Sequence, residues 1–267
     1  MAQDDKKALM EDGPSEEVWA NLLECDKELN KARAYQEIRT LERLDAVYRK
    51  RRETTKGIKK FWPTVFDEHG LLEPHLQYRD DLQALSHLTD FWLERDPQEP
   101  RAFTAEFHFS ENPYFSDAVL KKEFKYELVE VDGQLPSSVK GADGMSEAMY
   151  AFDWNENIKP QAIRINWKSD DKNLTKLNPR KAEVEDEDDI LDPGSFFNFF
   201  EHADDPHDLG PLFSEDLFPE AIDYFHGRGP NSKDAEGDLD GDDDSQDDNS
   251  GDEEIDLERP KKKAKTG

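Results

Sequence analysis

A long stretch without proline or glycine, from Ser15 to Thr55, restricts the possible folds of this chain more than any other feature. Ser15 can cap the first turn of a helix, and Glu16 and Glu17 follow it where the helix dipole favours negative charge. Basic side chains gather at the other end, in residues 49–52, where the dipole favours positive charge. The sequence therefore predicts one continuous helix over residues 15–56.

Apolar residues recur along this predicted helix at spacings of three and four, so they form one stripe. At a rise of about 1.5 Å per residue the helix is about 60 Å long, which exceeds the width of a domain built from the rest of the chain. A second copy of the helix would bury the stripe, so the sequence predicts a homodimer. The alternative is a single long helix that lies across its own domain. The predicted dimerisation residues are Val18, Leu22, Cys25, Leu29, Ala32, Ile38, Leu41 and Leu44.

The residues after Gly57 have a pattern typical of a small α+β domain, which we expect over residues 57–228. A helical apolar cluster is followed by four segments in which apolar and polar residues alternate. Short connections between most of them favour an antiparallel sheet with one face exposed to water. The four strands are expected at residues 87–94, 103–109, 120–131 and 162–168, and the last helix at residues 212–225.

Four phenylalanines between residues 196 and 200 stand out because they are so close together. Aromatic clusters of this kind are more often core than binding platform, so we expect Phe196, Phe197, Phe199 and Phe200 to be buried.

Acidic residues dominate the chain, with 64 Asp and Glu against 35 Lys and Arg and a net charge of −29. This balance excludes binding of bare nucleic acid by the chain as a whole. Residues 231–267 hold 14 acidic and 6 basic side chains, so most of the negative charge belongs to the part that is expected to fold. Residues 234–250 contain almost no apolar side chain, so burial cannot offset the entropy of ordering them. We expect residues 1–14 and 229–267 to be disordered.

The basic C-terminal end has the form of a nuclear localisation signal. This pattern predicts importin as a partner and a nuclear location, with passage through the cytoplasm. The alternatives are a solubilising charge cluster or a segment that folds back onto the acidic tail. The residues of the predicted signal are Lys261, Lys262, Lys263 and Lys265.

Motifs of catalysis and cofactor binding are missing from the sequence. It contains no glycine-rich phosphate loop and no Gly-x-Ser-x-Gly elbow. Acidic and histidine residues between His202 and Asp208 could ligate a metal, but their spacing matches no zinc pattern. The only cysteine, Cys25, lies on the apolar stripe. No apolar run approaches the length of about 18 residues that a membrane span needs. We therefore predict a protein that is not an enzyme and has no cofactor, metal or membrane partner.

Several short motifs together resemble the nucleosome assembly protein (NAP)/SET family, and their order and spacing match it from Ser15 to Tyr224. Within the family, this sequence resembles most the SET branch and its fungal relative that works with a histone H3 acetyltransferase. The motifs are Phe61-Trp62, the block Phe107 to Phe115, Ile165-Asn166-Trp167-Lys168, Ser195 to Phe200, and Pro211 to Leu217.

This resemblance implies a histone chaperone with a long dimerising helix and an "earmuff" domain. Such a protein binds core histones and promotes nucleosome assembly. The choice between H3/H4 and H2A/H2B stays open, as does presentation of histone to an acetyltransferase. The alternative is an acidic adaptor of the SET type, a phosphatase inhibitor or acetyltransferase cofactor without chaperone activity. The resemblance places histone contacts on the concave underside of the domain, at Asn198, Glu201, Asp204, Asp205, Asp208, Glu215 and Asp216.

Overall fold

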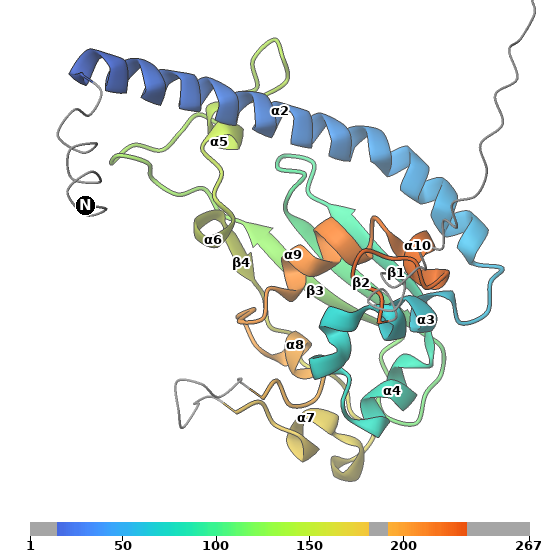
Figure 1. Ribbon diagram of the computed structural model, residues 1–267. Helices are drawn as coiled ribbons and strands as arrows, with labels where there is room; N and C mark the ends of the chain where they lie inside the picture. Colours follow the sequence, from blue (N-terminus) through green and yellow to red (C-terminus); the bar gives the residue numbers. More distant parts are fainter. Residues whose placement is uncertain (1–14, 182–191, 234–267) are drawn as a thin grey trace, which may run out of the picture. The chain divides into compact units, whose positions relative to one another are not determined.

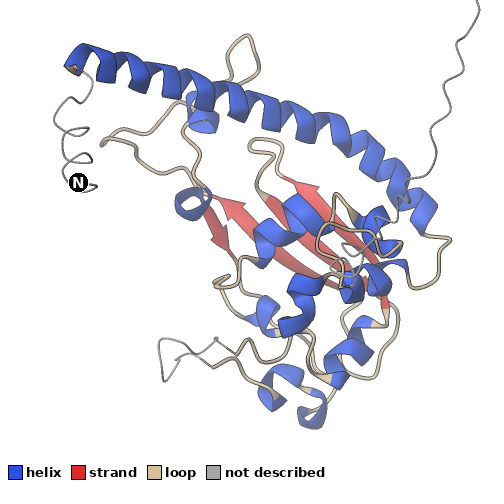
Figure 2. Ribbon diagram, in the orientation of Figure 1, coloured by secondary structure: helices blue, strands red, loops and turns tan. Residues whose placement is uncertain are grey.

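The computed structural model describes residues 15–181 and 192–233, which form a long helix, a four-stranded antiparallel sheet and several short helices (Figures 1 and 2). This architecture confirms the predicted α+β fold. The long helix, α2, spans Glu16–Thr55. The Ser15 hydroxyl accepts a hydrogen bond from the backbone N–H of Val18 at 3.4 Å, so Ser15 caps the helix as predicted.

The sheet has the strand order β1-β2-β3-β4, and every neighbouring pair is antiparallel. Phe91, Phe107 and Leu120 lie opposite one another across the first three strands, and they point to the same face. That face is the buried one. The strands are β1 (Leu88–Arg95), β2 (Phe103–Phe109), β3 (Val119–Tyr126) and β4 (Ile158–Pro160).

The fourth strand does not lie where the sequence predicted it, at residues 162–168. The edge strand is the shorter segment β4, which contains Pro160, and an edge is where a strand tolerates a residue without an N–H group. The predicted segment bonds elsewhere: Ile163 N–H donates to the Phe200 carbonyl at 2.8 Å, and Lys168 N–H donates to the Tyr114 carbonyl at 2.8 Å. Its alternation therefore reflects one face that packs on the core, with Ile165 buried, and not a place in the sheet.

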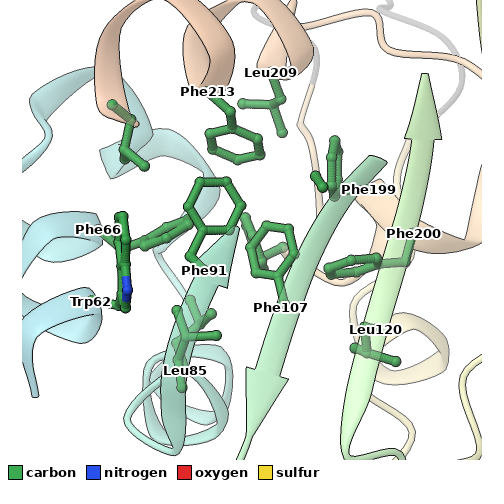
Figure 3. Close-up of a cluster of buried hydrophobic side chains, with 14 of the residues drawn as sticks. Trp62, Phe66, Leu85, Phe91, Phe107, Leu120, Phe199, Phe200, Leu209 and Phe213 are labelled. Atoms are coloured by element: carbon green, nitrogen blue, oxygen red, sulfur yellow. The ribbon is translucent and has the colours of Figure 1, made fainter. Parts of the chain in front are cut away.

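Short helices cover the buried face of the sheet, and their aromatic side chains form the core (Figure 3). The Phe91 and Phe107 rings lie 4.7 Å apart between their centres, and Phe107 lies 5.0 Å from Phe200. All four phenylalanines of the 196–200 cluster are buried, which confirms their predicted role. The helices are α3 (Phe61–Glu68), η1 (Gly70–His75), α4 (Arg79–Leu85), α8 (Asn198–Glu201), α9 (Leu209–Pro211), η3 (Leu212–Leu217) and α10 (Ala221–Phe225).

The predicted last helix over residues 212–225 is divided into two pieces. The first, η3, is a π-helical turn in which Phe218 N–H donates to the Phe213 carbonyl. Pro219 follows and has no N–H to continue the ladder, so α10 begins only at Ala221.

The second half of α2 is fixed to its own domain. Arg52 Nε lies 2.6 Å from Asp90 of β1, and Arg51 Nη1 donates to the Phe218 carbonyl at 2.5 Å. Near its middle, α2 packs Ile38 against Met145 and Met149, beside and within the short helix α5 (Glu147–Tyr150). The helix therefore buries part of its stripe within its own chain.

The domain continues past residue 228, where the sequence predicted its end. Asn231 Nδ2 donates to Asp216 at 2.6 Å, Ser232 pairs with His69, and the Lys233 ammonium lies 3.2 Å from Asp67. Residues 229–233 thus belong to the domain and not to the tail.

Candidate functional site

A buried carboxylate positions the segment that carries most of the predicted binding residues. Asp81 of α4 accepts hydrogen bonds from the Ser195 hydroxyl at 2.7 Å and from the Phe196 N–H at 2.8 Å. The side chain is fully buried, and burial raises the pKa of Asp81 to about 6. This contact holds the aromatic cluster under the sheet, so the acidic residues after it lie on the helical side of the domain.

Two of the predicted histone contacts, Asn198 and Glu201, support the fold. The Asn198 amide is buried and donates to the Asn178 and Pro193 carbonyls at 3.0 and 3.2 Å. Glu201 accepts hydrogen bonds from Trp167 Nε1 at 3.2 Å and from the Thr175 hydroxyl at 2.6 Å. Both side chains are bonded within the chain, and their contact with a histone stays a prediction.

Asp205 and Asp216 are likewise occupied within the chain. Asp205 accepts hydrogen bonds from the N–H groups of Leu209 and Gly210, at 3.0 and 2.6 Å, and so caps α9. Burial raises its pKa. Asp216 accepts hydrogen bonds from the Tyr224 hydroxyl at 2.8 Å and from Asn231. Both carboxylates are engaged within the chain, and their contact with a histone stays a prediction. Asp216 still adds negative charge to the surface.

Three predicted residues remain open to solvent: Asp204, Asp208 and Glu215. Arg180 binds both carboxylate oxygens of Asp204, at 2.9 and 3.0 Å, and this bond lowers the pKa of Asp204. Asp208 and Glu215 are exposed, and no hydrogen bond or ion pair engages their carboxylates within the described residues. These two are therefore the best placed of the seven to bind a basic partner.

Asp208 and Glu215 lie on the rim of an open groove of about 510 Å³. Asp216 completes the acidic part of its lining, and none of the described residues that line the groove is Lys or Arg. The apolar part of the lining comes from η1, from the end of α9 and the start of η3, and from Pro193. It consists of Leu71, Pro74, Pro193, Pro211 and Leu212.

Two histidines also line this groove, His75 and His207, and their rings lie 4.8 Å apart between their centres. Burial lowers the pKa of His75 to about 4, and burial also lowers the pKa of His207. Both imidazoles are neutral at pH 7, so they do not offset the carboxylates. The groove as a whole is negative.

The first half of α2 presents a second surface, an apolar stripe. The side chains of Leu22 and Leu29 are 50% and 54% exposed, and Val18, Cys25 and Ala32 are exposed as well. In Figure 1 this half of the helix extends beyond its contact with α5. The exposed stripe contains five of the eight predicted dimerisation residues.

The other three predicted dimerisation residues face the same chain. Ile38 is fully buried against Met145 and Met149, so it is not available to a partner. Leu41 and Leu44 are half-buried, and Leu41 lines a small cavity with Arg101 and Trp154. The periodicity placed all eight on one stripe, but its second half is partly covered by residues beside and within α5 and by the surroundings of Arg101 and Trp154.

Lys261, Lys262, Lys263 and Lys265 lie outside the described residues. Among residues 15–181 and 192–233, no three His, Cys, Asp or Glu side chains are arranged to hold a metal ion. In the same part of the chain, no helix is long and apolar enough to cross a membrane.

The family model for nucleosome assembly protein (NAP) matches residues 13–228. The chain belongs to the NAP family. This match covers most of the chain, including the exposed stripe and the groove, and it confirms the resemblance seen in the sequence.

Relatives within the NAP family are 25–29% identical to this chain over the aligned regions. Human nucleosome assembly protein 1-like 4 is 29% identical over 197 residues, which cover 67% of this chain and 50% of the relative. Nucleosome assembly protein 1-like 1-A of Xenopus laevis is 28% identical over 204 residues, with coverage of 70% and 50%. This NAP-family chain spans about half the length of these relatives.

Solved structures have the same NAP fold. A Ccp1 mutant superposes with a TM-score of 0.56 at 24% identity, covering 79% of this chain and 94% of that one. Vps75 superposes with a TM-score of 0.52 at 16% identity, covering 79% of this chain and 98% of Vps75.

Sequence reasoning missed two groups of exposed apolar residues in this NAP-family chain. Trp19 and Leu23 are exposed beside the predicted stripe, and their spacing of four could have indicated a wider apolar face. Leu71 is exposed at the groove. No local pattern marks Leu71, because its neighbours across the groove come from residues 193–212.

Proposed function

We propose that this protein is a histone chaperone that binds core histones and promotes nucleosome assembly. The observation that carries the proposal is the negative groove, in which Asp208 and Glu215 are exposed and no described lining residue is basic. Core histones are strongly cationic, so this surface and the net charge of −29 attract them and compete with DNA phosphates for their Lys and Arg side chains. Membership of the NAP family supports the same function.

The active form in this proposal is a homodimer paired through the exposed half of α2. A closed two-fold pair uses the same surface on both copies, so Val18, Leu22 and Leu29 of one helix would meet the equivalent stripe of the other. Pairing doubles the net charge presented to a histone.

Competition with DNA tests the proposal directly. The purified full chain is titrated into complexes of DNA with H3/H4 or with H2A/H2B at physiological ionic strength, and free DNA is measured. We expect release of DNA from at least one histone pair, followed by nucleosome formation on added plasmid. Failure to remove either pair from DNA would contradict the chaperone function and favour the acidic adaptor.

Two finer parts of the proposal concern partners. Presentation of histone to an acetyltransferase predicts faster acetylation of H3 when the chain is added to enzyme and histone, and an unchanged rate would exclude it. Import by importin predicts nuclear accumulation that is lost when Lys261, Lys262 and Lys263 are replaced by alanine.

A further inference from the structure

The groove of about 510 Å³ is lined by apolar side chains as well as by acidic ones. Leu71 of η1 leaves 56% of its side chain in water, and Leu212 is half-buried across the groove. Pro74 and Pro211 extend the same apolar lining. This lining offers one apolar side chain of a partner a place to be removed from water.

The charges around this apolar lining restrict the partner. Asp208, Glu215 and Asp216 surround it, and His75 and His207 are neutral at pH 7. Lys and Arg side chains of a partner would meet complementary charge at the rim, whereas an acidic segment would be repelled.

We propose that the groove binds a cationic peptide segment by one apolar side chain, which is seated between Leu71 and Leu212 while flanking Lys or Arg side chains reach Asp208 and Glu215. The inference rests on the proposed function, because a core histone segment is the cationic ligand it would take. It adds an apolar anchor to a surface that would otherwise recognise only charge.

An apolar anchor would make part of the binding free energy independent of salt, which ion pairs alone would not. Salt screens the ion pairs at the exposed rim, but it does not weaken the burial of a leucine side chain. Affinity should therefore contain one part that falls with salt and one part that does not.

Two synthetic Lys-rich peptides test the inference, one with a single central leucine and a twin with serine at that position. Their affinities for the full chain are measured by fluorescence anisotropy over a range of salt concentrations. We expect the leucine peptide to bind about tenfold more tightly at every salt concentration. Leu71→Ser should remove this difference while leaving the salt dependence unchanged.

Leu177→Ser is the matched control, because Leu177 lies on the separate helix α7 (Leu174–Leu177) and is 52% exposed. It should preserve the tenfold difference. Equal binding of the two peptides by the wild-type chain, or equal losses in Leu71→Ser and Leu177→Ser, would overturn the inference. Failure of the wild-type chain to bind core histones would contradict the proposed function alone, because the peptide difference is measured separately.

Discussion

The Asp81 carboxylate and the Ser195 hydroxyl lie 2.7 Å apart in the core, and this bond joins α4 to the segment that leads to the acidic groove. The carboxylate has no exposed surface and accepts only neutral donors, the Ser195 hydroxyl and the Phe196 N–H. The effect of burial therefore outweighs the effect of these two hydrogen bonds, and it raises the pKa of Asp81 from 3.8 to about 6.

Stability should depend on pH through this residue. The folded chain holds the Asp81 proton more tightly than the unfolded chain does. Its contribution to the free energy of unfolding is therefore fully present below pH 3.8 and is lost as the pH rises through about 6. Asp81→Asn does not titrate, and its amide can bond both Ser195 and Phe196. Relative to wild type, the variant should gain about 2 kcal/mol between pH 4 and pH 7.

Urea unfolding at several pH values and one protein concentration measures this gain. Asp132→Asn, in an exposed turn, is the control and should follow wild type. A difference between wild type and Asp81→Asn that does not change with pH would contradict the assignment.

Dimerisation should depend on the exposed half of α2. Replacing Leu22 and Leu29 by glutamate puts charges into the proposed interface, and the two-fold axis makes each substitution count twice. The dimer dissociation constant should rise at least about 100-fold. The variant should keep its helix content, because the domain stays folded. Light scattering coupled to size exclusion gives the mass.

Leu177→Glu, off the long helix, should leave the dimer intact. A double variant that stays dimeric, or a wild-type chain that is monomeric, would favour the alternative of a single helix lying across its own domain.

The buried Glu99–Arg101 pair should be far more sensitive to substitution than any surface pair. Arg101 binds both oxygens of Glu99, at 2.6 and 2.9 Å, donates to the Met149 carbonyl and lies over the Phe152 ring. Arg101→Met leaves a buried carboxylate without its partner, and we expect a loss of about 3–5 kcal/mol in the free energy of unfolding. Adding Glu99→Gln should restore part of it.

Lys125→Met is the comparison, because it breaks the exposed pair of Lys125 and Glu127. It should cost less than about 1 kcal/mol. Similar losses in Arg101→Met and Lys125→Met, measured by urea unfolding, would show that burial does not decide the effect.

Local periodicity was sufficient to predict the long helix and three of the four strands. Phe103 to Phe109 alternates because one face of β2 is buried and the other is half-exposed, and that cause lies within the segment itself. The same reasoning was wrong for the fourth strand, which was predicted at residues 162–168 and lies at Ile158–Pro160. Residues 162–168 alternate because Ile163, Ile165 and Trp167 pack on the core while the residues between them are exposed, but the backbone bonds to Phe200 and Tyr114 and not to a strand of the sheet.

The candidate site was predictable only as a region. The sequence shows that an aspartate is charged, but it does not show whether the carboxylate accepts hydrogen bonds from other residues of the folded chain. Asp205 and Asp208 lie three residues apart, yet Asp205 caps α9 and Asp208 faces solvent. In the same way, the stripe on α2 did not show that Met145 and Met149 would cover Ile38.

The exposed and the bonded acidic residues should therefore differ in mutational effect. Asp208→Asn with Glu215→Gln removes two exposed charges, and Asn is tolerated at the positive φ of 51° that Asp208 adopts. Core-histone affinity should fall about fivefold at physiological salt and depend less on salt, with the melting temperature unchanged. Glu201→Gln should instead lower the melting temperature, because Glu201 holds Trp167 and Thr175.

Glu111→Gln with Glu156→Gln removes the same charge from exposed positions outside the groove and serves as the matched control. Long-range attraction acts on all four carboxylates alike, so a general charge effect would weaken histone binding equally in both double variants. Direct contact at the groove predicts a larger loss for the Asp208 and Glu215 pair, and this difference should persist when salt screens the long-range part. Equal losses at every salt concentration would mean that histones bind the acidic chain without preference for this groove.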